Sequence, residues 1–167
     1  MSLRRAAHPL WRFSLGLYRR DGVEQACLGL QNACGADVNL LLFCCWMGSQ
    51  GMALDKRSLR RAIAATKPWQ QQVVQPLRRA RRALKQPGAA RPEARRAHLR
   101  QSVFRLELDA EYVEQLVLAR LAAKLPRPAR KQDPQAASAA NLERYLALLG
   151  APLGPVTKRR MMTLCRA

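Results

Sequence analysis

Apolar residues recur at helical spacing through the first third of the chain. Steps of three and four residues connect them from about Pro9 to Arg19, and again in a second run that Gly35 closes. Such steps place side chains on one face of an α-helix. A third run, which Asp37 can cap, is apolar almost all round from Val38 to Trp46. Because a helix without a polar face is typical of a protein core, the pattern predicts two amphipathic helices packed on a central buried one.

The middle of the chain combines narrower apolar stripes with many basic residues. Asp55 can cap a fourth helix, and the Lys67-Pro68 step should interrupt it, because the residue before a proline avoids the helical conformation. A fifth helix is predicted from Trp69 to about Gln86. It should bend at Pro76, where the backbone lacks an amide donor.

Two more helices are predicted in the next stretch. Pro92 can open a short helix that ends near Arg100, and Asp109 can cap a more apolar one. The expected domain plan is therefore one helical domain over residues 1–125.

The last forty residues or so change in composition. Residues 126–137 hold three prolines among charges and alanines, which indicates a linker. Apolar spacing then predicts a C-terminal helix over residues 138–149. Residues 150–167 begin with glycine and proline and end in basic residues, so we expect a disordered tail there.

Overall composition favours the same fold class. Hydrophobic residues make up 49% of the chain and aromatic residues only 5%, and Leu and Ala dominate the apolar set. These residues favour helices over strands. We therefore expect an all-α fold, a compact bundle of about six or seven helices with a basic C-terminal half.

Charge is concentrated in one segment. The chain has 30 Lys and Arg against 11 Asp and Glu, a formal charge of +19. Residues 56–105 hold half of those cations and a single acid, Glu93. A GC-rich genome would raise the arginine content, but it would not remove acids, so we interpret the excess as functional and expect an acidic partner.

The candidate binding residues lie on the two helices of this segment. Guanidinium groups offer a planar fork of donors that suits phosphate. Trp69 could stack on a base, although it could equally be a hinge residue folded onto the core. The predicted anion-binding set is Lys56, Arg57, Arg60, Arg61, Lys67, Trp69, Arg78, Arg79, Arg81, Arg82 and Lys85.

No motif in the sequence predicts a reaction, a cofactor or a metal. His8 and His98 lie on segments that do not suggest catalysis, and no glycine-rich phosphate loop occurs. Five cysteines without Cys-x-x-Cys spacing favour reduced thiols packed in a core, as in a cytoplasmic protein. Neither a signal peptide nor a membrane-spanning run is predicted. Asn39 stands out as a polar residue that enters an apolar helix. It could bond to another helix or to a ligand, and we expect the bond to another helix.

The first half of the chain resembles a known family. The similarity lies in Trp11-Arg-Phe-Ser, in Cys27-Leu and above all in Gly35-Ala-Asp-Val-Asn-Leu-Leu-Leu, and it spans roughly residues 9–85. The family is an uncharacterised group of short helical proteins from proteobacteria, including pseudomonads, catalogued as a domain of unknown function. The resemblance implies a cytosolic bacterial protein with a variable region after the match, and it favours association with RNA or the ribosome. It implies no catalytic residue.

Two functions from different classes remain open at this point. In the first, the basic helices neutralise the phosphates of an anionic polymer, RNA or a ribonucleoprotein, with little sequence selectivity. In the second, the same face docks an acidic protein, and charge sets the rate and specificity of docking. Attachment to an anionic membrane surface is less favoured, because the apolar stripe lacks large anchoring residues. The sequence does not decide the oligomeric state.

Overall fold

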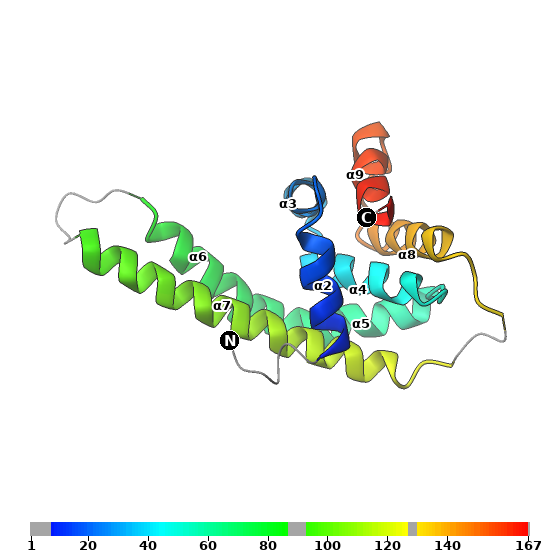
Figure 1. Cartoon of the computed structure of the whole chain (residues 1–167), viewed down its shortest axis with the longest axis horizontal. Coiled ribbons are helices and arrows are strands. Elements are labelled where there is room, and N and C mark those ends of the chain that lie inside the picture. The colour runs from blue at the N-terminus through cyan, green and yellow to red at the C-terminus, as the bar shows by residue number, and fades with distance from the viewer. Residues whose placement is uncertain (1–7, 87–92, 127–129, 167) are drawn as a thin grey trace.

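The computed structural model describes residues 8–86, 93–126 and 130–166, and every regular element in those ranges is a helix (Figure 1). This confirms the predicted all-α bundle of about seven helices. The elements are α2 (Pro9–Tyr18), α3 (Val23–Cys34), α4 (Val38–Ser49), α5 (Lys56–Trp69), the π-helical turn η1 (Gln70–Val74), α6 (Gln75–Ala83), α7 (Glu93–Ala122), α8 (Pro134–Leu148) and α9 (Pro155–Arg166).

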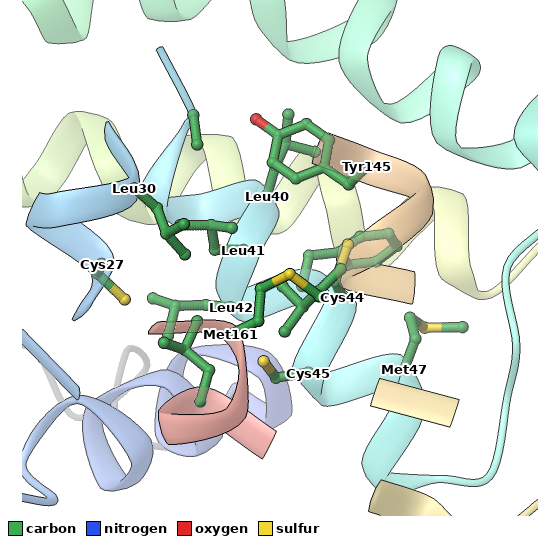
Figure 2. Packing of buried hydrophobic residues seen from close by; sticks show 14 of the residues in the cluster. Cys27, Leu30, Leu40, Leu41, Leu42, Cys44, Cys45, Met47, Tyr145 and Met161 are labelled. Carbon is green, nitrogen blue, oxygen red and sulfur yellow. The ribbon is translucent and has the colours of Figure 1, made fainter. Parts of the chain in front are cut away.

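Helix α4 forms the centre of the core, as its sequence predicts. Leu40 to Cys45 are all buried, and α2, α3, α7 and α8 pack around them (Figure 2). Asn141 of α8 fixes the end of α4: its Nδ2 donates to the carbonyl oxygens of Cys44 at 3.1 Å and Met52 at 2.9 Å. Burial raises the pKa of the Cys44 and Cys45 thiols far above the ordinary value, so both thiols pack as neutral core groups.

A long helical hairpin projects from this core. Helices α5 and α6 and the turn between them form one continuous helix, and α7 lies alongside it (Figure 1). We call the outer part of this hairpin, α6 with the first half of α7, the arm. The arm has few buried apolar residues, and none of α6 is buried.

One proline of the hairpin, Pro68, does not have the effect on the helix that the sequence predicts. Pro68 does not interrupt α5, which runs on to Trp69. Because Pro68 is exposed, water can bond the carbonyl that its ring leaves without a donor. Pro76 lies at the start of α6, directly after the π-helical turn, and a bend there stays a prediction.

The second helix of the hairpin is also longer than predicted. The expected short helix ending near Arg100 and the one capped by Asp109 are a single helix of 30 residues, α7. Asp109 lies inside it. The predicted opening of this stretch at Pro92 lies outside the described residues.

The C-terminal predictions need the largest correction. Residues 155–166 form helix α9 and are not a disordered tail, and Met161 and Leu164 are buried against the core. Helix α8 begins at Pro134, four residues earlier than predicted, because the carboxylate of Asp133 accepts a hydrogen bond from the amide of Ala136. The predicted linker is therefore shorter, and residues 127–129 within it are not described.

Candidate functional site

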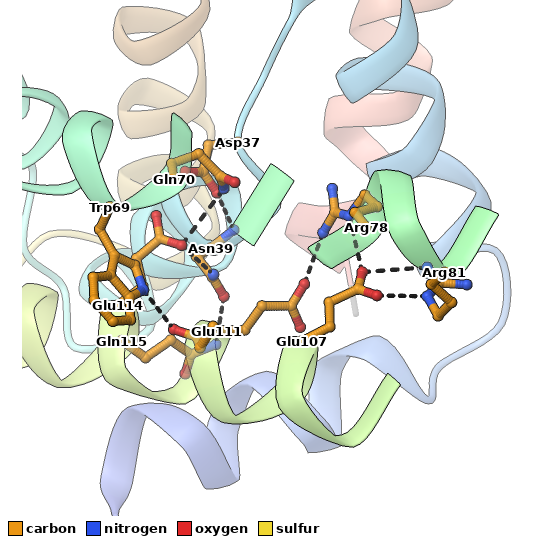
Figure 3. Close-up of polar contacts among 11 residues, drawn as sticks. Asp37, Asn39, Trp69, Gln70, Arg78, Arg81, Glu107, Glu111, Glu114 and Gln115 are labelled. Carbon is orange, nitrogen blue, oxygen red and sulfur yellow. Dashed lines mark hydrogen bonds and ion pairs between the residues drawn. The ribbon is translucent and has the colours of Figure 1, made fainter. Parts of the chain in front are cut away.

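Two of the predicted anion-binding arginines are paired inside the molecule. Arg78 donates from Nε to Glu107 at 3.0 Å and from Nη2 to Glu111 at 2.7 Å, and Arg81 also donates to Glu107 (Figure 3). Burial favours protonation of Glu107, but the hydrogen bonds from Arg81 and Arg78 outweigh it and lower the pKa of this carboxyl. These ion pairs hold α6 against α7, so Arg78 and Arg81 are not available to a partner.

Trp69 also has a structural role. Its indole Nε1 donates to the carbonyl oxygen of Ala110 at 2.9 Å, which joins the base of the arm to α7. Of the two readings that the sequence left open, the structure supports the hinge residue folded onto the core.

The remaining cations of the set are exposed, and within the described residues they make no hydrogen bond or ion pair. Their side chains point to different sides of the long helix. The π-helical turn adds an extra residue, which rotates later side chains by about 100° relative to a plain α-helix. With that rotation, one series falls along a single side of the continuous helix; we call it the cation row, and it consists of Lys56, Arg60, Lys67, Arg79 and Arg82. Arg57 and Arg61 point to another side, and Lys85 lies at the end of the arm.

Beside the arm, a chain of hydrogen bonds between polar side chains crosses the core. Ser14 donates to Gln115 at 3.2 Å, Gln115 to the side-chain oxygen of Asn39 at 2.9 Å, and Asn39 to Oε2 of Glu114 at 2.8 Å (Figure 3). Gln70, in the π-helical turn, donates to the same oxygen at 3.5 Å. All five residues are buried. The prediction that Asn39 bonds to another helix is thus confirmed.

Glu114 is uncharged in this network at neutral pH. Its side chain is 1% exposed, and burial raises the pKa of the carboxyl to about 10, with a further contribution from the neighbouring Asp37. Burial and the neighbouring Asp37 carboxyl both favour the protonated form of Glu114. Oε1 of Glu114 has no hydrogen-bond partner among the described residues.

An open cavity of about 350 Å³ lies between the arm and the junction of α3 and α4. Its lining residues are mostly polar. They are Gln31, Asn32, Gly35, Ala36 and Asp37 from the junction, and Gln70, Gln75, Arg78, Arg79 and Arg82 from the long helix. The cavity thus joins the end of the polar network to the outer part of the cation row.

Comparison with known sequences places this arrangement in a family. A sequence model described as "Protein of unknown function (DUF2390)" matches residues 9–118. The chain belongs to this family. The DUF2390 segment contains the arm, the cavity and the whole polar network, whereas α8 and α9 follow it. No curated protein and no solved structure matches the chain.

The described part of this DUF2390 protein shows no other kind of site. It contains no group of three or more His, Cys, Asp or Glu side chains that could hold a metal ion. None of its described helices is long and apolar enough to cross a bilayer.

Sequence reasoning missed the acidic side of the arm and most of the network. A signal was present: Glu107, Glu111 and Glu114 follow each other at four- and three-residue steps, which places them on one face of a helix. Gln70 gave no signal, because it stands in a run of three glutamines and only Gln70 is buried.

Proposed function

We propose that this protein is a non-enzymatic binding protein whose long helix, from α5 through α6, contacts an anionic polymer, RNA or a ribonucleoprotein. The observation that supports this most is the cation row: five exposed cations, aligned along one side of a continuous helix, that have no acidic partner among the described residues. From Lys56 to Arg82 the row extends roughly 39 Å, at 1.5 Å per residue. A phosphate backbone can follow such a row and release its counterions.

Charge reversal at the outer end of the row tests the proposal. Arg79 and Arg82 are exposed and form no ion pair with any described residue. The double variant Arg79→Glu/Arg82→Glu should therefore keep its helicity and lose at least tenfold in affinity for single-stranded RNA at 100 mM salt. The wild-type affinity should fall steeply between 50 and 200 mM salt, and the variant should show a shallower slope. Affinity would be measured by fluorescence anisotropy.

The control reverses the same amount of charge elsewhere. Lys158 and Arg159 are exposed on α9, which lies away from the arm (Figure 1). The variant Lys158→Glu/Arg159→Glu should retain most of the affinity. Equal losses in the two variants would mean that net charge, and not the row, governs binding.

A protein-docking function is the second candidate, and a different surface favours it. Leu99, Leu106 and Val113 of α7 are 51%, 54% and 39% exposed and follow one another at seven-residue steps. Large apolar side chains in such a line are typical of helix-docking faces. A stoichiometric protein complex that survives nuclease treatment and is lost in Leu106→Glu would favour this function over RNA binding.

A further inference from the structure

We propose that the cavity between the arm and the α3–α4 junction binds one nucleotide, with the phosphate near Arg79 and Arg82 and the base near Gln70. The nucleotide can be a free mononucleotide or one unit of an RNA strand. Only the second form rests on the proposed function. The first stands on the cavity alone.

The charges of the lining residues indicate where a phosphate would bind. Arg78 is already matched by Glu107 and Glu111 at 3.0 and 2.7 Å. Arg79 and Arg82 have no such partner in the part of the chain that the structure describes, so two guanidinium groups at one end of the cavity are left to bind an anion. Guanidinium binds phosphate oxygens through paired hydrogen bonds.

The opposite end of the cavity has hydrogen-bonding atoms without partners. Gln70 is 8% exposed, and its Oε1 has no hydrogen bond among the described residues; the same holds for Oε1 of Gln31. Exchanging O and N in the Gln70 amide would only leave the nitrogen unpaired instead. An unpaired buried amide group costs about 1 to 3 kcal/mol, so a ligand that completes it gains affinity.

The excess of acceptors at this end indicates the kind of base. Gln31 and Gln70 offer amide oxygens, and Asp37 adds a carboxyl group. Adenine, cytosine and guanine each present an exocyclic amino group that can donate to such acceptors, whereas uracil has none. We therefore expect a preference for amino-bearing bases.

The dimensions agree with one nucleotide. A volume of about 350 Å³ lies at the lower end of small-molecule sites. The rise along the helix from Gln70 to Arg79 is roughly 14 Å, and the arginine side chain can reach back over part of this distance. A phosphate ion alone would occupy only the arginine end and leave the Gln70 amide unpaired.

Isothermal titration of the full chain with nucleoside monophosphates tests the inference. AMP, CMP and GMP should bind with micromolar to low millimolar dissociation constants, and UMP at least fivefold more weakly. Ribose 5-phosphate and adenosine, the two halves of AMP, should each bind at least tenfold more weakly than AMP. Absence of AMP, CMP and GMP binding at 5 mM, or equal affinity for ribose 5-phosphate and AMP, would overturn the proposal.

Two double variants separate this inference from the proposed function. Arg79→Ala/Arg82→Ala removes the phosphate end and should weaken AMP binding at least tenfold. Arg60→Ala/Lys67→Ala removes the same charge from the part of the cation row outside the cavity, so it should lower RNA affinity and leave AMP affinity within twofold. AMP binding that is lost equally in both variants would contradict a site in the cavity.

Competition between AMP and RNA distinguishes the two sources of the nucleotide. If RNA containing adenine competes with AMP and RNA of uracil alone does not, the cavity takes a unit of the strand. If AMP binds and no RNA does, the site holds a free nucleotide, and the proposed function fails while this inference stands.

Discussion

Glu114 shows how far its surroundings can change one side chain. The carboxyl is closed off from water, accepts hydrogen bonds from Asn39 and Gln70, and lies beside the carboxyl of Asp37. With a pKa of about 10 when folded, it keeps a proton that the unfolded chain releases near pH 4.5. Between these two pH values the folded state binds more protons than the unfolded state, so stability falls as the pH rises.

We predict that Glu114→Gln is more stable than the wild type at neutral pH. Glutamine is neutral in both states, so it avoids the cost of protonation and can still accept from Asn39 while donating toward Asp37. The gain should be on the order of 2 kcal/mol at pH 7. It should shrink toward pH 4.5 and grow toward pH 9, as measured by urea unfolding across that range.

The matched control is Glu143→Gln on the exposed side of α8. A hydrated side chain at the surface should change stability by less than about 0.5 kcal/mol. If Glu114→Gln were less stable than the wild type by the same amount at every pH, Glu114 would be ionised in the fold and this account of the network would be wrong.

Single residues were the hardest level to predict from sequence. The basic set contained both Arg78, which is paired, and Arg79, its exposed neighbour. Charge and helical spacing do not separate the two unless the position of α7 is known. Trp69 likewise could be assigned only after Ala110 was found within hydrogen-bond distance at 2.9 Å. Whether a side chain is buried and paired depends on which residues face it from the neighbouring helix. The local sequence pattern does not contain that information.

At the scale of elements, the π-helical turn determines which way the arm faces. Thr66, Gln70 and Val74 follow one another at four-residue steps and are all buried, although such steps would carry the side chains of a plain α-helix away from α7. The extra residue in Gln70–Val74 rotates the following side chains back toward α7, so that Arg78 contacts Glu107.

Deleting Gln72, an exposed residue of this turn, should misalign the arm. The remaining residues would form a plain α-helix, and α6 would rotate by about 100° and lose its ion pairs with α7. Because a buried carboxylate left without its partners costs about 3 to 5 kcal/mol, we expect a drop of this order in the free energy of unfolding, or faster tryptic cleavage of the arm. Gln72→Ala, which keeps the length, should change stability by less than about 0.5 kcal/mol. A deletion variant as stable as Gln72→Ala would show that the turn does not set the phase.

Most helices could be predicted from apolar spacing, but their interruptions could not. The sequence rules place a break at Lys67-Pro68 and a bend at Pro76, because proline removes a hydrogen bond. The break at Lys67-Pro68 does not occur, because packing of the long helix against α7 keeps α5 helical through Pro68 to Trp69. The π-helical turn depends on tertiary contacts with α7, so no local signal announces it.

At the scale of the whole molecule, α9 is part of the packed helical core. It packs on α3 and α8, and Arg160 donates to the carbonyl oxygen of Gly29 at 3.0 Å. Basic residues and prolines around the helix suggested disorder. The buried positions Thr157, Met161 and Leu164 follow helical steps, but they are too few to stand out in so short a segment.

Leu164→Ala should therefore destabilise the entire protein. Leu164 is 2% exposed, and truncation of a buried leucine to alanine costs about 2 to 5 kcal/mol. Thermal unfolding followed by circular dichroism should show one cooperative transition at a lower temperature. Val156→Ala, at a position 57% exposed on the same helix, serves as the control and should shift the transition little. An unchanged midpoint in Leu164→Ala would indicate that α9 is not docked in solution.

The position of α4 also bears on how the chain is made. Its surface is apolar almost all round, and α8, which contacts it most extensively, follows after the whole hairpin has been synthesised. At 5 to 20 residues per second, the ribosome releases α4 on the order of ten seconds before α8 emerges. During that interval α4 is an exposed apolar segment of the nascent chain, because α8 cannot yet pack on it. We expect the newborn protein to depend on a holding chaperone, and to aggregate when translation pauses within the arm.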